Sequence, residues 1–273
     1  MKKTILFTAA ALIASSLFAF DSELLEPRGN VKNYTKTEYS VSSKFGEYFR
    51  TVASKHEHTF SDGLRKETTS YTSKDELTDR ITYEYHGDRA VASTSFFDAS
   101  GKLTKKIAYE YADGKIKSET EFNGDNILTA KNIYRYETGR RTESLYNSDG
   151  KLINRSIFMI SADDKVLEAS YYFGDGTLSH GEKFLYTDKG ELSAIENLDS
   201  DRKKAGKTVF RHDEKGFVNE IQIYATDTDL IERDIIKTNA DGDPVRISVY
   251  SIAEKFGATA NELVSITEYT YNK

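Results

Sequence analysis

The chain has 273 residues, with 38 basic and 44 acidic side chains, a formal net charge of −6 and a hydrophobic fraction of 38%. An acidic chain without a basic cluster disfavours nucleic acid and anionic membranes as partners. It has no cysteine, which excludes a disulfide framework and a lipidated cysteine. The hydrophobic fraction is low for a domain with a thick core, and it favours a thin sheet with a large surface.

The N-terminus has the layout of a secretory signal peptide. Two lysines near the start are followed by an apolar stretch from Ile5 to Phe20. This stretch is shorter than the roughly 20 apolar residues that a spanning helix needs. We predict a signal peptide at 1–19, with cleavage after Ser16 or Ala19, and export to the periplasm or the extracellular space. No membrane-spanning segment is expected after cleavage.

The first elements after the signal are an arm and two strands. Residues 20–33 contain Pro27 and are predicted to form an irregular N-terminal arm. Residues 31–41 alternate in the period of a strand. Residues 47–60 fit a helical stripe as well as a strand, and the repeat described next favours the strand.

Two series of large apolar residues run through the chain, each recurring every 24 to 26 residues. Such self-similarity is typical of a repeat architecture. The first series contains Phe45, Tyr71, Phe96, Phe122, Tyr146, Tyr172, Tyr224 and Tyr250, with Leu198 in the remaining position. The second series is offset by half a repeat and contains Tyr85, Tyr111, Tyr136 and Tyr186, with Tyr34, Phe60, Ile160, His212 and Thr238 in the equivalent positions. We predict that these residues are structural rungs, stacked from repeat to repeat.

Turn signals built on Gly, Asp or Asn recur about every 13 residues, and the segments between them alternate with period two. Strands joined by such short turns are antiparallel neighbours. The sequence therefore predicts an all-β fold, with a β-repeat domain at 34–250. The domain would be a long antiparallel meander of about 18 strands, built from 26-residue two-strand repeats.

The meander must curve, because open twisted sheets seldom exceed about ten strands. We predict a curled or coiled single sheet, while the pattern leaves open whether it closes into a barrel. An outer-membrane barrel would need an apolar residue at every second position. The strand around Lys117, Glu119 and Glu121 disfavours that alternative, because it is charged on one face and polar in the middle of the other.

The rhythm ends near Tyr250. Residues 252–262 carry no turn signal of the usual kind and are predicted to be an inserted loop or short helix. Residues 263–271 alternate again and predict a closing strand. We assign 251–273 to a C-terminal insertion and capping strand.

The local pattern of the second series is an aromatic pair, an Asp-rich turn, Gly and an aliphatic residue. It occurs as FLYTDKGEL at residues 184–192 and as YEYADGKI at residues 109–116. This pattern resembles the YD repeats of the RHS family and, less closely, the MORN-type repeats of exported bacterial proteins. The resemblance covers roughly residues 29–250 and implies a β-repeat architecture. It implies no catalytic residues, and the chain has no segment equivalent to the toxin domain of large RHS proteins.

Few residues suggest chemistry. His56 and His58 would lie on one face of a strand and, with Asp62, are weak candidates for a zinc site, although no third His or Cys is near in sequence. Asp-rich turns such as 239–243 lack the spacing of an EF-hand and suit hairpins equally well. No cofactor is expected. A binding site is expected where the second series loses its aromatic character, at His212 and Thr238, or at 252–262.

These observations predict an exported, non-enzymatic β-repeat protein that binds a partner or forms a scaffold in the bacterial cell envelope. Its partner would be a protein or an envelope glycan. One alternative is the outer-membrane β-barrel, and another is a hydrolase or carbohydrate-binding protein. The sequence has no serine nucleophile elbow, no phosphate-binding loop and no Cys–His pair, so an enzyme is not expected.

Overall fold

The computed structural model describes residues 25, 27, 31–44, 47–255 and 258–272. The described part of the chain forms 18 β-strands. They are β1 (Asn33–Lys44), β2 (Glu47–Ser61), β3 (Leu64–Thr72), β4 (Leu77–Tyr85), β5 (Val91–Asp98), β6 (Leu103–Ala112), β7 (Lys115–Asn123), β8 (Leu128–Glu137), β9 (Arg140–Asn147), β10 (Leu152–Ile160), β11 (Val166–Phe173), β12 (Leu178–Tyr186), β13 (Leu192–Leu198), β14 (Lys204–His212), β15 (Val218–Tyr224), β16 (Leu230–Thr238), β17 (Pro244–Lys255) and β18 (Ala258–Asn272).

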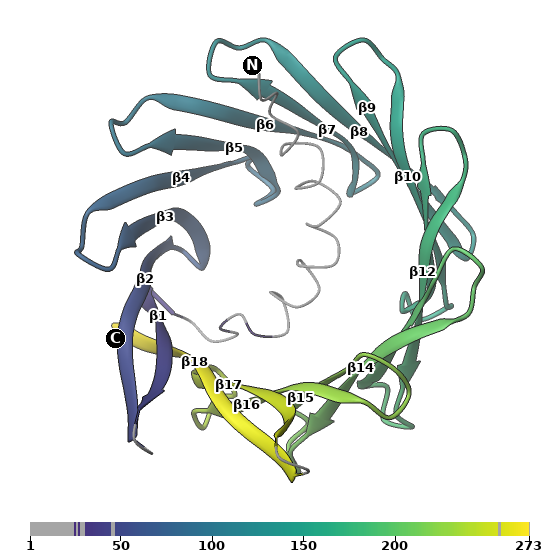
Figure 1. Cartoon of the computed structure of the whole chain (residues 1–273). Coiled ribbons are helices and arrows are strands. Elements are labelled where there is room, and N and C mark those ends of the chain that lie inside the picture. The colour runs from purple at the N-terminus through teal and green to yellow at the C-terminus, as the bar shows by residue number, and fades with distance from the viewer. Residues whose placement is uncertain (1–24, 26, 28–30, 45–46, 256–257, 273) are drawn as a thin grey trace, which may run out of the picture.

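Each strand pairs antiparallel with the next strand along the chain, and β1 also pairs with β18, so the sheet closes into a barrel (Figure 1). The predicted open sheet, curled or coiled, is therefore wrong. An open sheet would leave β1 and β18 with unpaired backbone groups at its edges. The closing pairs run from Asn33–Asn272 to Ser40–Ser265 and satisfy those groups.

The turns lie where the sequence predicts them, and their Asp and Asn residues have one repeated role. The side-chain oxygen at the end of a strand accepts hydrogen bonds from the backbone N–H groups two and four residues later, at 2.9–3.1 Å. This bonding shapes the turn without help from distant residues. It recurs at Asp98, Asn123, Asn147, Asp199, Asp213 and Asn239.

Gly124 allows one turn to approach the neighbouring hairpin. A Cβ atom at this position would lie 2.1 Å from the carbonyl oxygen of Leu103, whereas at Gly87 it would meet nothing within 4 Å. We expect Gly124→Ala to lower the free energy of unfolding by about 1–3 kcal/mol, because the backbone must shift. Gly87→Ala should be neutral or slightly stabilising. Urea unfolding followed by circular dichroism measures both, and equal midpoints would contradict the close approach.

The two faces of the wall differ in exposure. Along β10, Phe158 is 4% exposed and its neighbour Met159 is 47% exposed. Along β12, Phe184 is 9% exposed and Leu185 is 44% exposed. Side chains converge on the concave side of a closed wall and spread apart on its convex side, so the buried set faces inward. Because paired residues share a face, the strand register extends this assignment around the barrel.

The two series lie on opposite faces. Tyr71, Phe122 and Tyr224 of the first series lie on the outer face, whereas the second series lies on the inner face with its partners two residues earlier. Phe96 is an exception, because its register with Ile81 and Lys105 places it inward. Its neighbour Phe97 takes the outer position, and Phe45 lies outside the described residues.

Successive residues of a series are two strands apart, or about 9.6 Å. This separation exceeds the 4.5–7 Å range of aromatic pairs, so the repeat spacing does not permit the predicted stacking. At several rings of both series, a cation from the preceding strand or turn lies over the ring. Lys55 lies 4.7 Å from the ring centre of Tyr71, and Lys165 lies 5.4 Å from that of Tyr186.

The segment predicted as an inserted loop or short helix is part of a long hairpin. β17 continues to Lys255, β18 starts at Ala258, and Ala253 pairs with Ala260. The strand prediction for 47–60 is confirmed by β2.

Candidate functional site

The inner wall is the surface that 18 strands enclose. A barrel of this strand number is about 35 Å across between backbones. Facing side chains are too short to meet over that width, so barrels of 16–18 strands are not filled by their own walls. The residues that line the inner face therefore decide what the barrel can hold.

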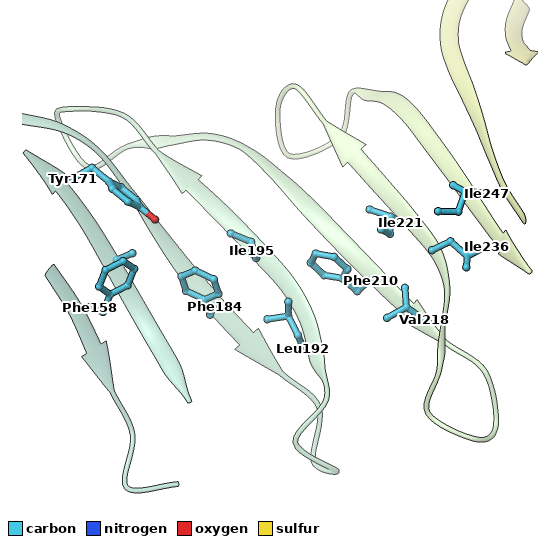
Figure 2. Close-up of a cluster of buried hydrophobic side chains, with 11 residues drawn as sticks. Phe158, Tyr171, Phe184, Leu192, Ile195, Phe210, Val218, Ile221, Ile236 and Ile247 are labelled. Carbon is cyan, nitrogen blue, oxygen red and sulfur yellow. The ribbon is translucent and has the colours of Figure 1, made fainter. Parts of the chain in front are cut away.

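One half of the inner wall, here called the apolar half, holds most of the buried apolar side chains, and the carboxylates of Glu182 and Asp234 share its face. A continuous cluster extends from β10 to β17 and projects from one face of these strands (Figure 2). Ile195, Ile221 and Ile247 are each less than 9% exposed. The cluster consists of Phe158, Ala169, Tyr171, Phe184, Leu192, Ile195, Phe210, Val218, Ile221, Ile236 and Ile247.

Leu25 of the N-terminal arm packs against this cluster and lines a small pocket at its edge, together with Phe217, Val218, Ile236, Thr238, Gly242 and Pro244. Thr238, where the sequence suggested a binding site, is thus part of a pocket lining. His212 pairs in register with Val218, a member of the same lining. The loss of aromatic character in the second series therefore coincides with this pocket.

Tyrosines of the second series connect neighbouring hairpins at the inner wall. The hydroxyl groups of Tyr85, Tyr111 and Tyr186 each donate to the carbonyl oxygen of the residue 20 positions earlier, at 2.7, 3.0 and 2.7 Å. Tyr271 donates likewise to the carbonyl oxygen of Pro244, at 2.6 Å. The role of the tyrosine is therefore a tether to the preceding hairpin.

This tether can be tested at Tyr111. Tyr111→Ala should lower the free energy of unfolding by about 2 kcal/mol, because it removes a half-buried ring and its hydrogen bond. Tyr111→Phe keeps the ring and removes only the hydroxyl, so it should lower the free energy of unfolding by about 1 kcal/mol. Lys117→Ala, at an exposed position of β7, is the control and should have little effect. Equal midpoints of chemical unfolding for the tyrosine variants and for Lys117→Ala would contradict the role of Tyr111 as a tether.

The closing seam carries an aromatic group on its inner face. Tyr34 of β1 is 2% exposed and stacks on His58 of β2, with ring centres 4.3 Å apart. Its ring centre also lies 6.0 Å from Phe60, 6.1 Å from Tyr269 and 5.9 Å from Tyr271. Rings from β1, β2 and β18 therefore meet where the barrel closes.

His58 is 8% exposed, and its two ring nitrogens have different surroundings. Nδ1 lies 3.0 Å from the hydroxyl of Thr68, whereas Nε2 has no hydrogen-bond partner. Burial and, to a smaller extent, the charges of Arg65, His56 and Lys36 lower the pKa of His58 to about 3. The guanidinium of Arg65 donates to the Tyr34 hydroxyl at 3.4 Å. The imidazole of His58 is thus neutral at physiological pH and lies beside cations.

The predicted zinc candidates are only partly brought together. His56 shares the inner face with His58, and its Nδ1 lies 3.0 Å from the hydroxyl of Ser70, which donates to Asp79 at 2.9 Å. Burial lowers the pKa of His56. Asp62 lies in the exposed β2–β3 turn. Within the described residues, no group of three His, Cys, Asp or Glu side chains could hold a metal ion.

A third patch on the inner wall contains carboxylates from β7 and β9. Burial raises the pKa values of Glu119 and Glu143. Glu143 forms an ion pair with Arg141 at 3.0 Å, and the Arg141 guanidinium lies 4.4 Å from the ring centre of Phe158. This patch lies next to the apolar half, since Arg141 and Phe158 are paired in register.

No protein-family model matches the chain, and no curated protein matches it either. Membership of the YD/RHS repeat family therefore stays a prediction. No helix in the described ranges is long and apolar enough to cross a membrane.

Several solved structures are similar to the chain at low identity. A porin-like protein from Bacteroides uniformis is 11% identical with a TM-score of 0.49, and the match covers 90% of this chain and 100% of that one. A LolA superfamily protein from Nitrosomonas europaea is 10% identical with a TM-score of 0.29, covering 94% and 91%. TcdB2-TccC3 is 9% identical with a TM-score of 0.27, covering 82% of this chain and 16% of that one.

Sequence reasoning missed the apolar half of the inner wall and the group around Tyr34 and His58. A signal for the first was present, because Phe158, Phe184 and Phe210 recur at the repeat spacing. Such a pattern indicates a shared face but not whether that face is inward.

Proposed function

We propose that the protein is an exported, non-enzymatic binding barrel that holds an apolar or amphipathic molecule against the apolar half of its inner wall. The observation that carries this proposal is the continuous cluster from Phe158 to Ile247 on the concave face of a single-layer sheet. An apolar sheet face gains stability only when something covers it. Leu25 packs against the cluster near one rim, and a bound molecule would lie over the partly buried apolar side chains that border the cluster, such as Ile223 and Val249.

The outer face supports a barrel surrounded by water. Register pairs join Glu168, Lys183, Glu196 and Lys207 in a row across β11 to β14. This row lies on the same face as the exposed Met159. A charged side chain near the middle of a bilayer costs about 2–4 kcal/mol in a membrane barrel. The charged row thus faces outward and the apolar cluster faces inward, which is the reverse of the wall of an outer-membrane barrel. This arrangement favours the binding barrel over the outer-membrane barrel.

Export rests on the N-terminal pattern of the sequence, since residues 1–24 lie outside the described part of the chain. An envelope or extracellular binding protein would use the closed wall to keep an apolar molecule away from water. The proposal makes the partner a small amphipathic molecule, in place of the protein or glycan that the sequence alone suggested.

The proposal is tested by titrating the mature protein with the fluorescent apolar probe N-phenyl-1-naphthylamine. We expect saturable binding that dodecanol displaces. Ile195→Thr changes the inner wall, and Ile157→Thr makes the same change on the outer face. The first should weaken probe binding about fivefold, because apolar contact is lost, and the second should leave binding unchanged.

Extraction of the protein from the cell envelope checks the compartment. We expect the protein to be released without detergent. Absence of saturable binding, or equal weakening by the two variants, would contradict the binding barrel. A strict requirement for detergent would favour the outer-membrane alternative.

A further inference from the structure

The apolar pocket and the buried histidine are connected by a row of tyrosines. Pro244 lines the pocket, and its carbonyl oxygen accepts the hydrogen bond from Tyr271. Tyr271 lies 5.9 Å from Tyr34, which stacks on His58 at 4.3 Å. These residues belong to β17, β18, β1 and β2, which are neighbours in the barrel. The path from the pocket to His58 therefore crosses three strand spacings, or about 14 Å.

The histidine at the end of this path has one ring nitrogen without a hydrogen-bond partner. The Nε2 atom of His58 is buried and makes no hydrogen bond, and a buried polar atom without a partner is destabilising. The hydroxyl of Thr68 lies at the other nitrogen and can donate to it. In that arrangement Nε2 carries the proton and is a free donor. An acceptor group is then required to satisfy it.

The charges around His58 select the kind of acceptor. Arg65 of β3 and Lys36 of β1 are the cations that act on the imidazole, with His56 on its own strand. Lys36 is paired with Glu38 at 2.8 Å, and Asp79 accepts the hydrogen bond of Ser70, so Arg65 is the main cation that acts on the imidazole. The field at Nε2 is therefore positive, which favours an anion.

We propose that His58 and Arg65 form the headgroup site for an anionic amphiphile whose apolar chain crosses the tyrosine row to the apolar half of the inner wall. This inference rests on the proposed function and specifies the ligand as an apolar chain with a carboxylate or phosphate head. The carboxylates of Glu119 and Glu143 lie at the other boundary of the apolar half, where Glu143 is already ion-paired with Arg141 at 3.0 Å.

The test compares twelve-carbon ligands with different heads by displacement of N-phenyl-1-naphthylamine. Dodecanoate and dodecyl phosphate should bind more tightly than dodecanol and dodecylamine. His58→Phe keeps a ring against Tyr34 and removes Nε2, and it should weaken dodecanoate binding about tenfold while leaving dodecanol binding unchanged. The matched control is His180→Phe, because His180 also stacks on an inward tyrosine, Tyr171, at 4.3 Å. It should change dodecanoate binding less than twofold.

The outcomes separate the two proposals. If the naphthylamine probe binds but dodecanoate shows no preference over dodecanol, the headgroup site is wrong and the binding barrel stands. Equal loss in His58→Phe and His180→Phe, or tighter binding of dodecylamine, also overturns the headgroup site. If the probe itself does not bind, both proposals fail. A preference for dodecyl phosphate over dodecanoate would identify the head as a phosphate.

Discussion

Replacing Tyr34 with alanine should lower the free energy of unfolding by about 3–5 kcal/mol, the cost expected for deleting a fully buried aromatic ring. Tyr34 is 2% exposed and contacts rings from β2 and β18. It lies in the strand that closes the barrel, in register with Tyr271 and His58. Removing the ring therefore leaves a cavity at the seam and weakens packing in three strands together.

Urea unfolding followed by circular dichroism measures this loss, and Tyr48→Ala is the control, because Tyr48 is 56% exposed on β2. That control should stay within about 0.5 kcal/mol of the wild type. Hydrogen exchange gives a second readout, in which amides of β1 and β18 should lose more protection than those of β10 and β11. Unchanged exchange at the seam would contradict the role assigned to Tyr34.

The second large effect is acid sensitivity caused by His58. Burial lowers its folded pKa to about 3, from an ordinary value near 6.5. As pH falls below 6.5 the unfolded chain binds a proton at this residue and the folded protein does not, so acid favours unfolding. The stability that neutral His58 provides is complete above pH 6.5 and decreases towards pH 3. With 1.36 kcal/mol per pKa unit, the total is about 5 kcal/mol, of which about 4 kcal/mol is lost by pH 3.

His58→Phe should remove this dependence, so the difference between wild type and variant should change by up to about 4 kcal/mol between pH 7 and pH 3. Comparing the two proteins cancels the contribution of the carboxylates, which titrate in both. His86→Phe is the control, because His86 is exposed after β4. Parallel stability curves for wild type and His58→Phe over this range would show that His58 is not the acid-sensitive group.

The hairpins could be predicted from the sequence because their turns are determined locally. Asn147 accepts hydrogen bonds from residues two and four positions later, so the information lies within five residues. Closure of the barrel, in contrast, is not determined by neighbouring residues in the sequence. Asn33 pairs with Asn272, and no local pattern in either strand indicates that the two edges meet.

The faces of the wall could be predicted only in part. Phe96 and Phe97 are adjacent aromatics, and a slip of one residue moves a side chain to the opposite face, so periodicity cannot distinguish them. Residues 252–262 lack a Gly–Asp turn signal, and only their pairing across the β17–β18 hairpin reveals the strand. The site around His58 depends on closure, because Tyr269 and Tyr271 reach Tyr34 from the far end of the chain.

The pairing of β1 with β18 also makes the strand order cyclic. In the described barrel every other strand pair joins consecutive strands, so the seam is the single strand pairing between segments distant in sequence. No strand of the closed barrel is therefore structurally the first or the last. A linker joining Asn272 to Asn33, with new termini at an exposed turn such as 148–151, would keep every strand pair. In such a permuted chain, β9 and β10 would be the strands that pair over the longest sequence distance. The slow, long-range step of folding is therefore set by where the chain ends lie, and moving the ends moves that step around the barrel.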